Sequence, residues 1–567
     1  MSDTTAVRSG EPGNRPLTVQ GDRTVLLEVH APGFQEARDM LALFAELEKS
    51  PEHVHTYRLT PLSIWNAAAA GLSAERIIEF LTAQSRYPVP PNVLRDVEEN
   101  IRRFGLLRLE RRDGRLVLLS GEPPLLVNIA RDASLKRFFE RDTGVPEGLV
   151  VREELRGEVK QALIRIGYPV EDLAGYTSGA ALAFELRETT LEGNPFALRP
   201  YQREAAEVFH AGGTEKGGSG VVVLPCGAGK TVVGIACMHR LQAQTLVLTT
   251  NTIAVRQWRN ELLSRTTLGP EDVGEYTGDA KEVRPVTIST YQMLTYRRRA
   301  SKEFTHFSLF SARDWGLVIY DEVHLLPAPV FRVTAEIQAR RRLGLTATLV
   351  REDGREDEVF SLIGPKKHDV PWKVLERQGW IATAHCVEVR LPLAPDLRFQ
   401  YLSAGARDRF RIASENPDKL PVVEALAARH GEDRVLIIGQ YLDQLDSLVA
   451  DLKCPLISGR TPTREREELY RRFRDGDLKV LAVSKVGNFA VDLPDANVAI
   501  QVSGTFGSRQ EEAQRLGRIL RPKSDRRPAT FYSVVTRDSR EEHFANNRQL
   551  FLTEQGYTYE IRDVTRL

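Results

Sequence analysis

The chain has 567 residues, a length that exceeds one hydrophobic core and predicts about three or four domains. Its 78 lysines and arginines nearly balance 77 aspartates and glutamates. The net charge of +1 therefore excludes a global field that attracts nucleic acid or membrane, and any polyanion site must come from local clustering. With 42% hydrophobic and 27% charged residues, the composition is that of an ordinary globular protein.

The cysteines and the N-terminal residues indicate the cellular compartment in which the protein is expected. Four cysteines are scattered without a C-x-x-C pair, which argues against a disulfide framework and fits a reducing environment: Cys226, Cys237, Cys386 and Cys454. No run approaches the ~18 apolar residues of a membrane span. The first residues, MSDTTAVRSGEPGNRP, lack the apolar core of a signal peptide. We expect a disordered leader over residues 1–18, a cytoplasmic location and no membrane partner.

Helical patterns dominate the first part of the chain. Thr60 and Pro61 begin one helix that stops at Gly71, and two more follow over residues 73–86 and 92–105. Two alternating runs then flank Asp113-Gly114, a strong hairpin signal. Three helices and a hairpin predict a winged-helix-like domain over residues 19–125, a module that docks DNA or protein. A helical interaction domain that happens to end in a hairpin is the equal alternative.

The pattern of apolar and polar residues changes near residue 190. Residues 126–190 suggest a small mixed α/β domain, and short apolar strands then alternate with amphipathic helices. Uninterrupted Val/Ile/Leu runs are typical of parallel strands covered on both faces. The break near residue 372 divides these strands into two lobes, residues 191–372 and 373–567. The fold class is therefore α/β, with two parallel-sheet lobes after a smaller N-terminal region.

The stretch LPCGAGKTVVG, residues 224–234, resembles a phosphate-binding loop between a strand and a helix. Gly227 and Gly229 let backbone N–H groups converge on phosphate oxygens. Lys230 can reach the β- and γ-phosphates, and Thr231 can ligate Mg²⁺. Leu224 stands where the usual pattern has its first glycine, so a chance Gly-Lys-Thr at a helix start is the alternative for this stretch alone.

A second motif, WGLVIYDEVHLL, ends a buried strand in Asp321-Glu322. Asp321 can hold Mg²⁺ at the strand's carboxyl end, and Glu322 can polarise the attacking water. Two acids that cap the next helix are the alternative for an isolated pair. The phosphate loop earlier in the same lobe favours the catalytic interpretation.

A third motif, QEEAQRLGRILRPK, lies in the second lobe. Gln514, Arg518 and Arg521 share one helix face. A solvated basic face is possible, but two arginines in a lobe without its own phosphate loop suit arginine fingers that reach across a cleft to the γ-phosphate. ATP would then pull the lobes together, as in a motor.

Taken together, the motifs resemble those of superfamily 2 helicases, which have two RecA-like lobes, and within them the XPB family. The superfamily resemblance spans about residues 195–525 and rests on LRPYQREA (198–205), PCGAGKT (225–231), DEVH (321–324), TAT (346–348), RED (351–353) and QRLGRILR (514–521). LGLTATLVRED joined to FSLIGPK, and DLAGYTSGAALAF, point to XPB. In this superfamily the first loop glycine is often replaced, so Leu224 does not count against ATP binding.

The resemblance implies further roles. Gln202 would read adenine, Gly487 and Asp492 would touch nucleotide and backbone, and Arg518 and Arg521 match the arginine fingers. The remaining matched positions would contact or couple to DNA: Thr250, Arg256, Gly278, Thr290, His324, Thr346, Thr348, Arg351, Glu352 and Asp353. The last three match an XPB element associated with strand separation.

Two segments depart from the family pattern. Only YLSAGARDRFRIASENPDK occupies the place of the family's basic helical insertion, the thumb. Residues 126–190 resemble more weakly the family's small domain linked to distorted DNA.

The expected function is an ATP- and Mg²⁺-dependent 3′→5′ DNA helicase or translocase, in DNA repair. DNA is the expected partner, in single-stranded or forked form and without sequence preference, together with a companion nuclease or repair complex. The alternatives are a double-strand DNA translocase, an RNA helicase or, from another class, a nucleic-acid scaffold with a silent ATP site. Lys230, Glu322 and Arg521 argue against the scaffold, because a silent site has no chemical need of all three.

Overall fold

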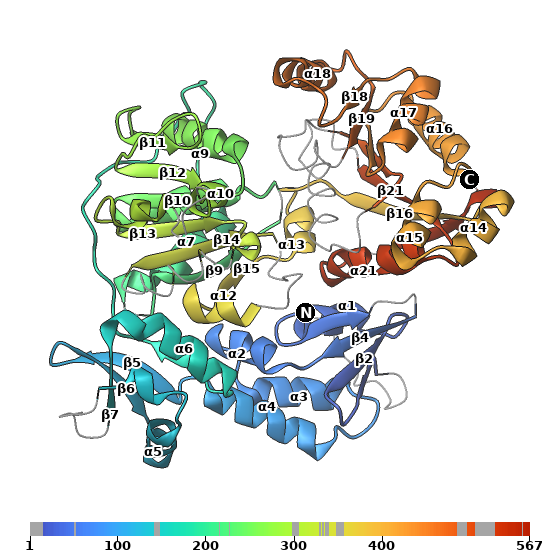
Figure 1. The fold of residues 1–567 in the computed structure, drawn as a ribbon. Coiled ribbons are helices and arrows are strands. Elements are labelled where there is room, and N and C mark those ends of the chain that lie inside the picture. The colour runs from blue at the N-terminus through green and yellow to red at the C-terminus, as the bar shows by residue number, and fades with distance from the viewer. Residues whose placement is uncertain are drawn as a thin grey trace, which may run out of the picture.

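The computed structural model describes residues 15–49, 53–140, 148–214, 216–225, 227–297, 305–327, 330, 334, 340–347, 356–484, 496–504, 528–557 and 559–566. Two parallel-sheet lobes stand side by side, and two smaller N-terminal units lie beneath them (Figure 1). The predicted fold class is confirmed. No helix in the described parts of the chain is long and apolar enough to cross a membrane.

The first N-terminal unit combines an antiparallel sheet with three helices. Its strands, in the order β1-β2-β4-β3, are β1 (Leu17–Val19), β2 (Thr24–Glu28), β3 (Glu46–Lys49) and β4 (Val54–Arg58), with α1 (Phe34–Leu41) between them. The predicted helices form as α2 (Pro61–Ala69), α3 (Ala74–Gln84) and α4 (Pro91–Arg103), and the Thr60 side chain caps α2 as expected. The sheet itself was not predicted, and β1 begins inside the leader expected to reach residue 18.

The predicted hairpin forms, but in a different unit. Strands β5 (Leu107–Arg112) and β6 (Arg115–Ser120) turn at Asp113-Gly114 and pair with β7 (Gly148–Val151) and β8 (Val170–Asp172), in the order β7-β6-β5-β8. Their apolar side chains pack with residues of α5 (Pro123–Arg131) and α6 (Arg156–Arg165) and not with α2–α4. The winged-helix-like grouping expected for residues 19–125 therefore gives way to two units that meet near residue 105.

The first lobe contains a seven-stranded parallel sheet in the order β11-β12-β10-β13-β14-β9-β15. Its strands are β9 (Ser219–Val223), β10 (Thr245–Thr249), β11 (Val273–Tyr276), β12 (Val286–Thr290), β13 (Leu317–Asp321), β14 (Arg341–Thr346) and β15 (Lys366–Asp369). The helices include α7 (Pro200–His210), α8 (Lys230–Leu241), α9 (Thr252–Arg265), α10 (Tyr291–Leu294) and α12 (Glu356–Leu362).

The second lobe repeats this arrangement. Its parallel order is β18-β19-β17-β20-β21-β16-β22, formed by β16 (Ala384–Leu391), β17 (Val435–Gly439), β18 (Leu456–Ile457), β19 (Val480–Ser484), β20 (Val498–Gln501), β21 (Ala529–Thr536) and β22 (Tyr559–Asp563). The helices include α13 (Trp372–Arg377), α14 (Arg398–Ser403), α15 (Ala406–Ser414), α16 (Lys419–Arg429), α17 (Leu442–Leu452), α18 (Thr463–Asp475) and α21 (Arg540–Glu554). Numbered from the start of each lobe, the strands follow the same order in both sheets, so β17 occupies the place that β10 has in the first lobe.

The N-terminal units contact both lobes. Trp65 of α2 packs against Phe360 of α12, with ring centroids 6.4 Å apart, and the Asn66 side chain accepts a hydrogen bond from the Lys366 backbone at 3.0 Å. Leu550 of α21, in the second lobe, belongs to the core of the first unit. The first unit is thereby anchored to both lobes.

Candidate active site

The phosphate loop lies at the carboxyl end of β9, where the chain enters α8. Gly229 is the N-cap of α8 with a left-handed φ of 82°, and a Cβ there would stand 2.6 Å from the Gln202 amide nitrogen. The left-handed backbone and the nearby Gln202 amide therefore favour glycine at this position. Leu224 is fully buried in the lobe core, and its backbone N–H donates to Thr346. Its side chain contributes to packing, which explains why a glycine is dispensable at this position.

Gln202, the residue expected to read adenine, lies against the loop. Its amide nitrogen donates to the Ala228 carbonyl at 2.9 Å, and its oxygen accepts from the Arg199 backbone N–H at 3.0 Å. Tyr201 also donates to Ala228, at 2.7 Å, and packs edge-on against Trp380. Because Trp380 follows α13, residues that link the lobes contact the nucleotide end of the first lobe.

The two carboxylates of DEVH face the loop lysine. Lys230 Nζ lies 2.5 Å from Glu322 Oε1, and the two side chains are 12% and 19% exposed. Asp321 accepts hydrogen bonds from the Trp258 indole N–H at 2.9 Å and from the Glu322 backbone at 3.1 Å. Glu322 itself has a left-handed φ of 51°, a strained conformation for a side chain other than glycine or asparagine. In this conformation the Glu322 carboxylate lies beside Lys230.

The two carboxyl groups titrate differently because their surroundings differ. Burial, and then the neighbouring Glu322 charge, raise the pKa of Asp321 to about 6. Burial also acts to raise the pKa of Glu322, but the charges of Lys230 and His324 outweigh it and lower that pKa below its ordinary value. The site thus places two buried carboxylates beside Lys230 and His324.

These residues fit Mg²⁺ and a triphosphate. Glu322 Oε2 is buried without a hydrogen-bond partner among the described residues, and Gly227 and Gly229 both have a left-handed φ in the loop that precedes Lys230. Thr231 follows Lys230 in the first turn of α8, and Asp321 ends β13. A hydroxyl and a carboxylate at these places are hard oxygen donors of the kind that Mg²⁺ prefers.

Three family models match the chain. The ERCC3/RAD25/XPB C-terminal helicase model matches residues 375–566, the model for the res subunit of type III restriction enzymes matches residues 195–351, and a model described as a helicase conserved C-terminal domain matches residues 17–143. DNA 3′-5′ helicase XPB of Kineococcus radiotolerans is 54% identical over 97% of this chain and 96% of its own length. The protein of the same name from Mycobacterium tuberculosis is 54% identical over 97% of this chain and 98% of its length. This chain belongs to the XPB family.

More distant members also align. The XPB/SSL2 helicase/translocase subunit of general transcription and DNA repair factor IIH from Saccharomyces cerevisiae is 31% identical over 97% of this chain and 72% of its own length. The XPB resemblance drawn from the motifs is thus confirmed, and the chain is an ATP-using helicase of superfamily 2.

In this XPB-family chain, DEVH and TAT are joined by a buried contact. His324 Nδ1 lies 2.7 Å from Thr346 Oγ1 and 3.5 Å from Glu322 Oε2. The imidazole therefore connects the Glu322 carboxylate to the end of β14. The other predicted coupling residues of this region lie outside the described residues: Thr348, Arg351, Glu352 and Asp353. So do the predicted nucleotide-cleft residues of the second lobe: Gly487, Asp492, Gln514, Arg518 and Arg521.

The remaining predicted DNA-contact residues follow adjacent parallel strands of the first lobe. Thr250 comes directly after β10, Thr290 ends β12, and Gly278 is exposed in the turn after β11. Arg256 is exposed on α9. The Thr290 hydroxyl accepts from the Met293 N–H at 3.1 Å and so caps α10, which gives it a structural role as well. These strand ends form one edge of the sheet.

Sequence reasoning missed two residues that shape the site, Trp258 and Tyr201. Trp258 is 1% exposed, and its indole orients Asp321, while Tyr201 fixes the loop carbonyl beside Gln202. Tyr201 stands in the quoted stretch LRPYQREA, but the roles of Trp258 and Tyr201 come from contacts that span 63 and 27 residues. The available signal for both roles was an aromatic side chain with a polar group that needs a hydrogen-bond partner when it is buried.

Proposed function

We propose that this protein is a DNA-dependent ATPase that moves 3′→5′ along DNA and separates its strands. The observation that carries the proposal is the Lys230–Glu322–Asp321 cluster, which lies at the carboxyl edge of the sheet in a chain whose second lobe repeats the same strand order. The names of the bacterial relatives, DNA 3′-5′ helicase XPB, supply the substrate and the polarity.

The residues of the site divide the work of hydrolysis. Thr231 and Asp321 hold Mg²⁺, which when bound neutralises charge on the phosphates. Lys230 binds the β- and γ-phosphates, and Glu322 takes a proton from the attacking water. Arg518 and Arg521, from the second lobe, stabilise charge that develops on the transferred phosphoryl group.

The Lys230–Glu322 ion pair gives the site two states. In one state Lys230 Nζ pairs with Glu322 Oε1 at 2.5 Å. When phosphates bind Lys230, they release Glu322, whose carboxylate then faces the water it must activate. The base is thereby kept neutralised until substrate arrives, which suppresses unproductive proton transfer.

His324 transmits the change. It contacts both Glu322 Oε2 and Thr346 Oγ1, so a shift of the carboxylate alters the hydrogen bond at the end of β14. In the sequence, Thr348, Arg351, Glu352 and Asp353 stand between β14 and α12, and α12 packs against α6 of the second N-terminal unit. We place the coupling of hydrolysis to DNA on this route, together with the strand ends at Thr250, Gly278 and Thr290.

The test is the steady-state ATPase rate of the full chain alone and with single-stranded DNA, duplex DNA or RNA, followed by unwinding of forks with a 3′ or a 5′ tail. Stimulation by DNA with unwinding only from the 3′ tail is expected. Stimulation by duplex without unwinding would favour a double-strand translocase, a reading that the short α14–α15 segment at the thumb position supports. Stimulation by RNA alone, or by no nucleic acid, would refute the proposal.

A repair role and a partner belong to the same proposal. The factor IIH relative is named as a subunit of a larger assembly, and we expect this protein to act in DNA repair in the cytoplasm with a companion nuclease or repair complex. Co-purification of the tagged full chain with nuclease activity on forked DNA would support this expectation, and purification as a free motor that is fully active would contradict it.

A further inference from the structure

Two buried aromatic side chains hold Asp321, the residue that ends β13. The Trp258 indole N–H donates to Asp321 Oδ2 at 2.9 Å, and the Tyr291 hydroxyl donates to the Asp321 backbone carbonyl, also at 2.9 Å. Trp258 is 1% exposed and Tyr291 is 4% exposed. The other carboxylate oxygen, Oδ1, accepts from the Glu322 backbone N–H at 3.1 Å. Asp321 is therefore fixed at both its side chain and its backbone.

The two aromatic residues reach Asp321 from opposite faces of the sheet. Trp258 packs in the same apolar cluster as Ile319 of β13, whereas Tyr291 packs in the same cluster as Tyr320, the next residue of that strand. Successive side chains of a strand point to opposite faces. The end of β13 is thus gripped from both apolar layers of the first lobe, by α9 on one face and by α10 on the other.

Each aromatic residue stands beside a predicted DNA contact. The helix α9 begins two residues after Thr250, and it carries the exposed Arg256 two positions before the buried Trp258. Helix positions two apart do not face the same side, so this helix presents one residue outward and the other to the core. Tyr291 directly follows Thr290, whose hydroxyl caps α10. A movement of α9 or α10 at the sheet edge therefore moves a hydrogen-bond donor of Asp321.

The packing around Trp258 leaves little room for the indole to move by itself. Its ring lies against α8, the helix that begins at Lys230, at a place where a Cβ on Gly234 would stand 2.5 Å from the indole. Close-packed interiors have few voids and transmit displacement from one side chain to the next. A shift of α9 is therefore passed on to Asp321 and α8, since the packing offers no space that would absorb it.

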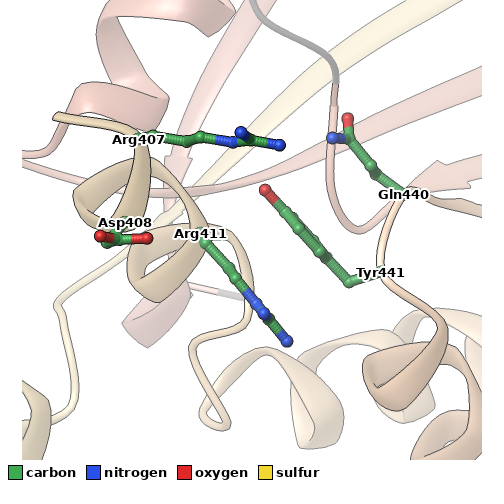
Figure 2. A pocket seen from close by; sticks show the side chains of 5 residues that line it. All are labelled: Arg407, Asp408, Arg411, Gln440 and Tyr441. Carbon is green, nitrogen blue, oxygen red and sulfur yellow. The ribbon is translucent and has the colours of Figure 1, made fainter.

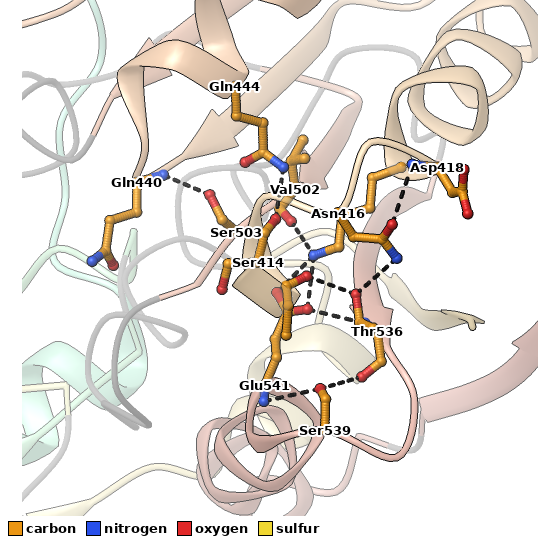
Figure 3. Close-up of polar contacts among 12 residues, drawn as sticks. Ser414, Asn416, Asp418, Gln440, Gln444, Val502, Ser503, Thr536, Ser539 and Glu541 are labelled. Atoms are coloured by element: carbon orange, nitrogen blue, oxygen red, sulfur yellow. Dashed lines mark hydrogen bonds and ion pairs between the residues drawn. The ribbon is translucent and has the colours of Figure 1, made fainter. Parts of the chain in front are cut away.

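The second lobe has the same strand order but holds the equivalent strand end differently. The counterpart of β13 is β20, which continues into Val502 and Ser503, neither of which is a carboxylate. Ser503 accepts a hydrogen bond from the Gln440 backbone N–H at 2.8 Å (Figure 3). Tyr441, the aromatic residue after β17, lines a cavity of about 320 Å³ together with Arg407 of α15 (Figure 2). The shared strand order therefore does not itself require aromatic donors at this place, and in the first lobe they accompany Asp321.

We propose that Trp258 and Tyr291 are positioning residues that couple DNA binding to ATP hydrolysis. The proposal rests on the proposed function, in which Asp321 holds Mg²⁺ and the strand ends before α9 and α10 contact DNA. Bound DNA moves these two helices, and the two aromatic donors carry the movement to Asp321. Donors that orient a ligating carboxylate tune its affinity for the metal, so DNA tightens the binding of metal and nucleotide. By linkage, metal and nucleotide tighten DNA binding by the same factor.

The test measures metal binding by the full chain without turnover. Mn²⁺ takes oxygen ligands as Mg²⁺ does, and its binding is followed by electron paramagnetic resonance with a non-hydrolysable ATP analogue, with and without saturating oligothymidylate. In the wild type, DNA should tighten Mn²⁺ binding about 5-fold or more. Trp258→Phe and Tyr291→Phe each keep an aromatic ring and remove one donor. If the two routes share the coupling, each substitution should leave an enhancement of about 2-fold, and the double substitution should leave none.

The matched control is Trp315→Phe in the same lobe. Trp315 is also 1% exposed, and its indole N–H donates to the Leu309 carbonyl at 2.9 Å, a bond that does not involve Asp321. This substitution removes an equivalent hydrogen bond and should keep the wild-type enhancement by DNA. Melting temperatures verify that each variant is folded. Should Trp258→Phe fail to fold, Tyr291→Phe, which removes a single oxygen atom, carries the test.

Each other outcome has a defined meaning. Mn²⁺ binding that Trp258→Phe and Tyr291→Phe weaken by the same factor with and without DNA would overturn the inference and leave both residues a structural role only. An enhancement in both variants equal to that of the control would overturn it as well. So would a wild type whose turnover DNA stimulates but whose Mn²⁺ affinity DNA leaves unchanged or lowers, with the proposed function intact. A wild type that neither binds DNA nor is stimulated by it would overturn the proposed function itself.

Discussion

Substitution of Glu322 by glutamine separates the two roles that the structure gives this carboxylate. The substitution keeps the shape of the side chain and a hydrogen-bond acceptor for Lys230 but removes the negative charge and the capacity to accept a proton. In the wild type, Lys230 lies 2.5 Å from Glu322, with both side chains less than a fifth exposed. The phosphates of ATP must therefore compete with Glu322 for the lysine.

The size of this competition follows from the burial. Exposed ion pairs contribute about 0.2–1 kcal/mol, and breaking a buried pair costs about 3–5 kcal/mol. For a partly buried pair in which glutamine keeps one hydrogen bond, the charge contributes about 1–2 kcal/mol. Glu322→Gln should therefore bind ATP about 5- to 30-fold more tightly than wild type. Its turnover should fall by about 10²- to 10⁴-fold because the general base is lost.

Two measurements on the full chain check the predicted gain in ATP affinity and the predicted loss of turnover. Affinity is measured with a fluorescent ATP analogue, and turnover with saturating ATP and DNA. The control is Glu207→Gln, a surface carboxylate paired with Arg240 on the same lobe, which should change neither quantity. Turnover near the wild-type rate would refute the assignment of Glu322 as the base. Weaker ATP binding together with lost turnover would refute the competition and leave Glu322 as a structural anchor of Lys230.

Three further predictions concern other parts of the machinery. Gly229→Ala forces a Cβ into a left-handed position against Gln202, and ATP affinity measured by titration should fall at least 10-fold, about 1.4 kcal/mol. Arg521→Ala should lower turnover far more than nucleotide affinity, and equal losses would favour a structural role. Asp172→Asn leaves two buried cations without their carboxylate, and urea denaturation at pH 7 should show a loss of about 3–5 kcal/mol. Because its cationic partners lower the pKa of Asp172 despite its burial, the wild type should lose this stability as the pH falls below about 4.

The strands that sequence reasoning found are those whose apolar runs are unbroken. LVIYD and VLIIG are buried in the middle of parallel sheets, where both faces demand apolar side chains. The strand β16, AHCVEVRL, escaped because Glu388 and Arg390 interrupt its pattern. Glu388 is nevertheless 0% exposed, because Arg390 and Gln549 neutralise and hydrogen-bond it. Partners supplied by a distant helix cannot be read from the strand itself.

The hairpin of β5 and β6 was grouped with the wrong helices because long-range contacts decide that grouping too. Its turn is a local signal and was predicted, whereas its neighbours in the sheet are set by long-range pairing: Leu107 lies opposite Val170, and Val117 opposite Val150. Nothing in the alternating pattern states which helices will cover its apolar face. The spacing of apolar and turn residues predicted individual helices and strands well. It predicted poorly how these elements pack together, because the free energy that selects one packing comes from contacts between residues remote in the chain.

Motif reasoning located the reacting groups but not the side chains that orient them. Lys230, Asp321 and Glu322 were predicted because phosphate chemistry requires those groups at strand ends, and the structure brings them together. Trp258 was not predicted, because its role is a single N–H directed at Asp321 from a helix that the motif does not include. The requirement for an orienting group is general, but the element that supplies it depends on packing.

The two lobes share one strand order but have different functional residues at their strand ends. Both sheets have the same strand order, so corresponding strand ends lie at corresponding edges. The first strand of the first lobe ends in the phosphate loop, whereas its counterpart β16 continues into Pro392 without a glycine loop. In each lobe the second strand is followed by a polar residue, Thr250 or Gln440, and then by a helix. Because the phosphate loop follows the first strand of the first lobe, the proposed function requires groups of the second lobe, such as Arg518 and Arg521, to reach the ATP that this loop binds.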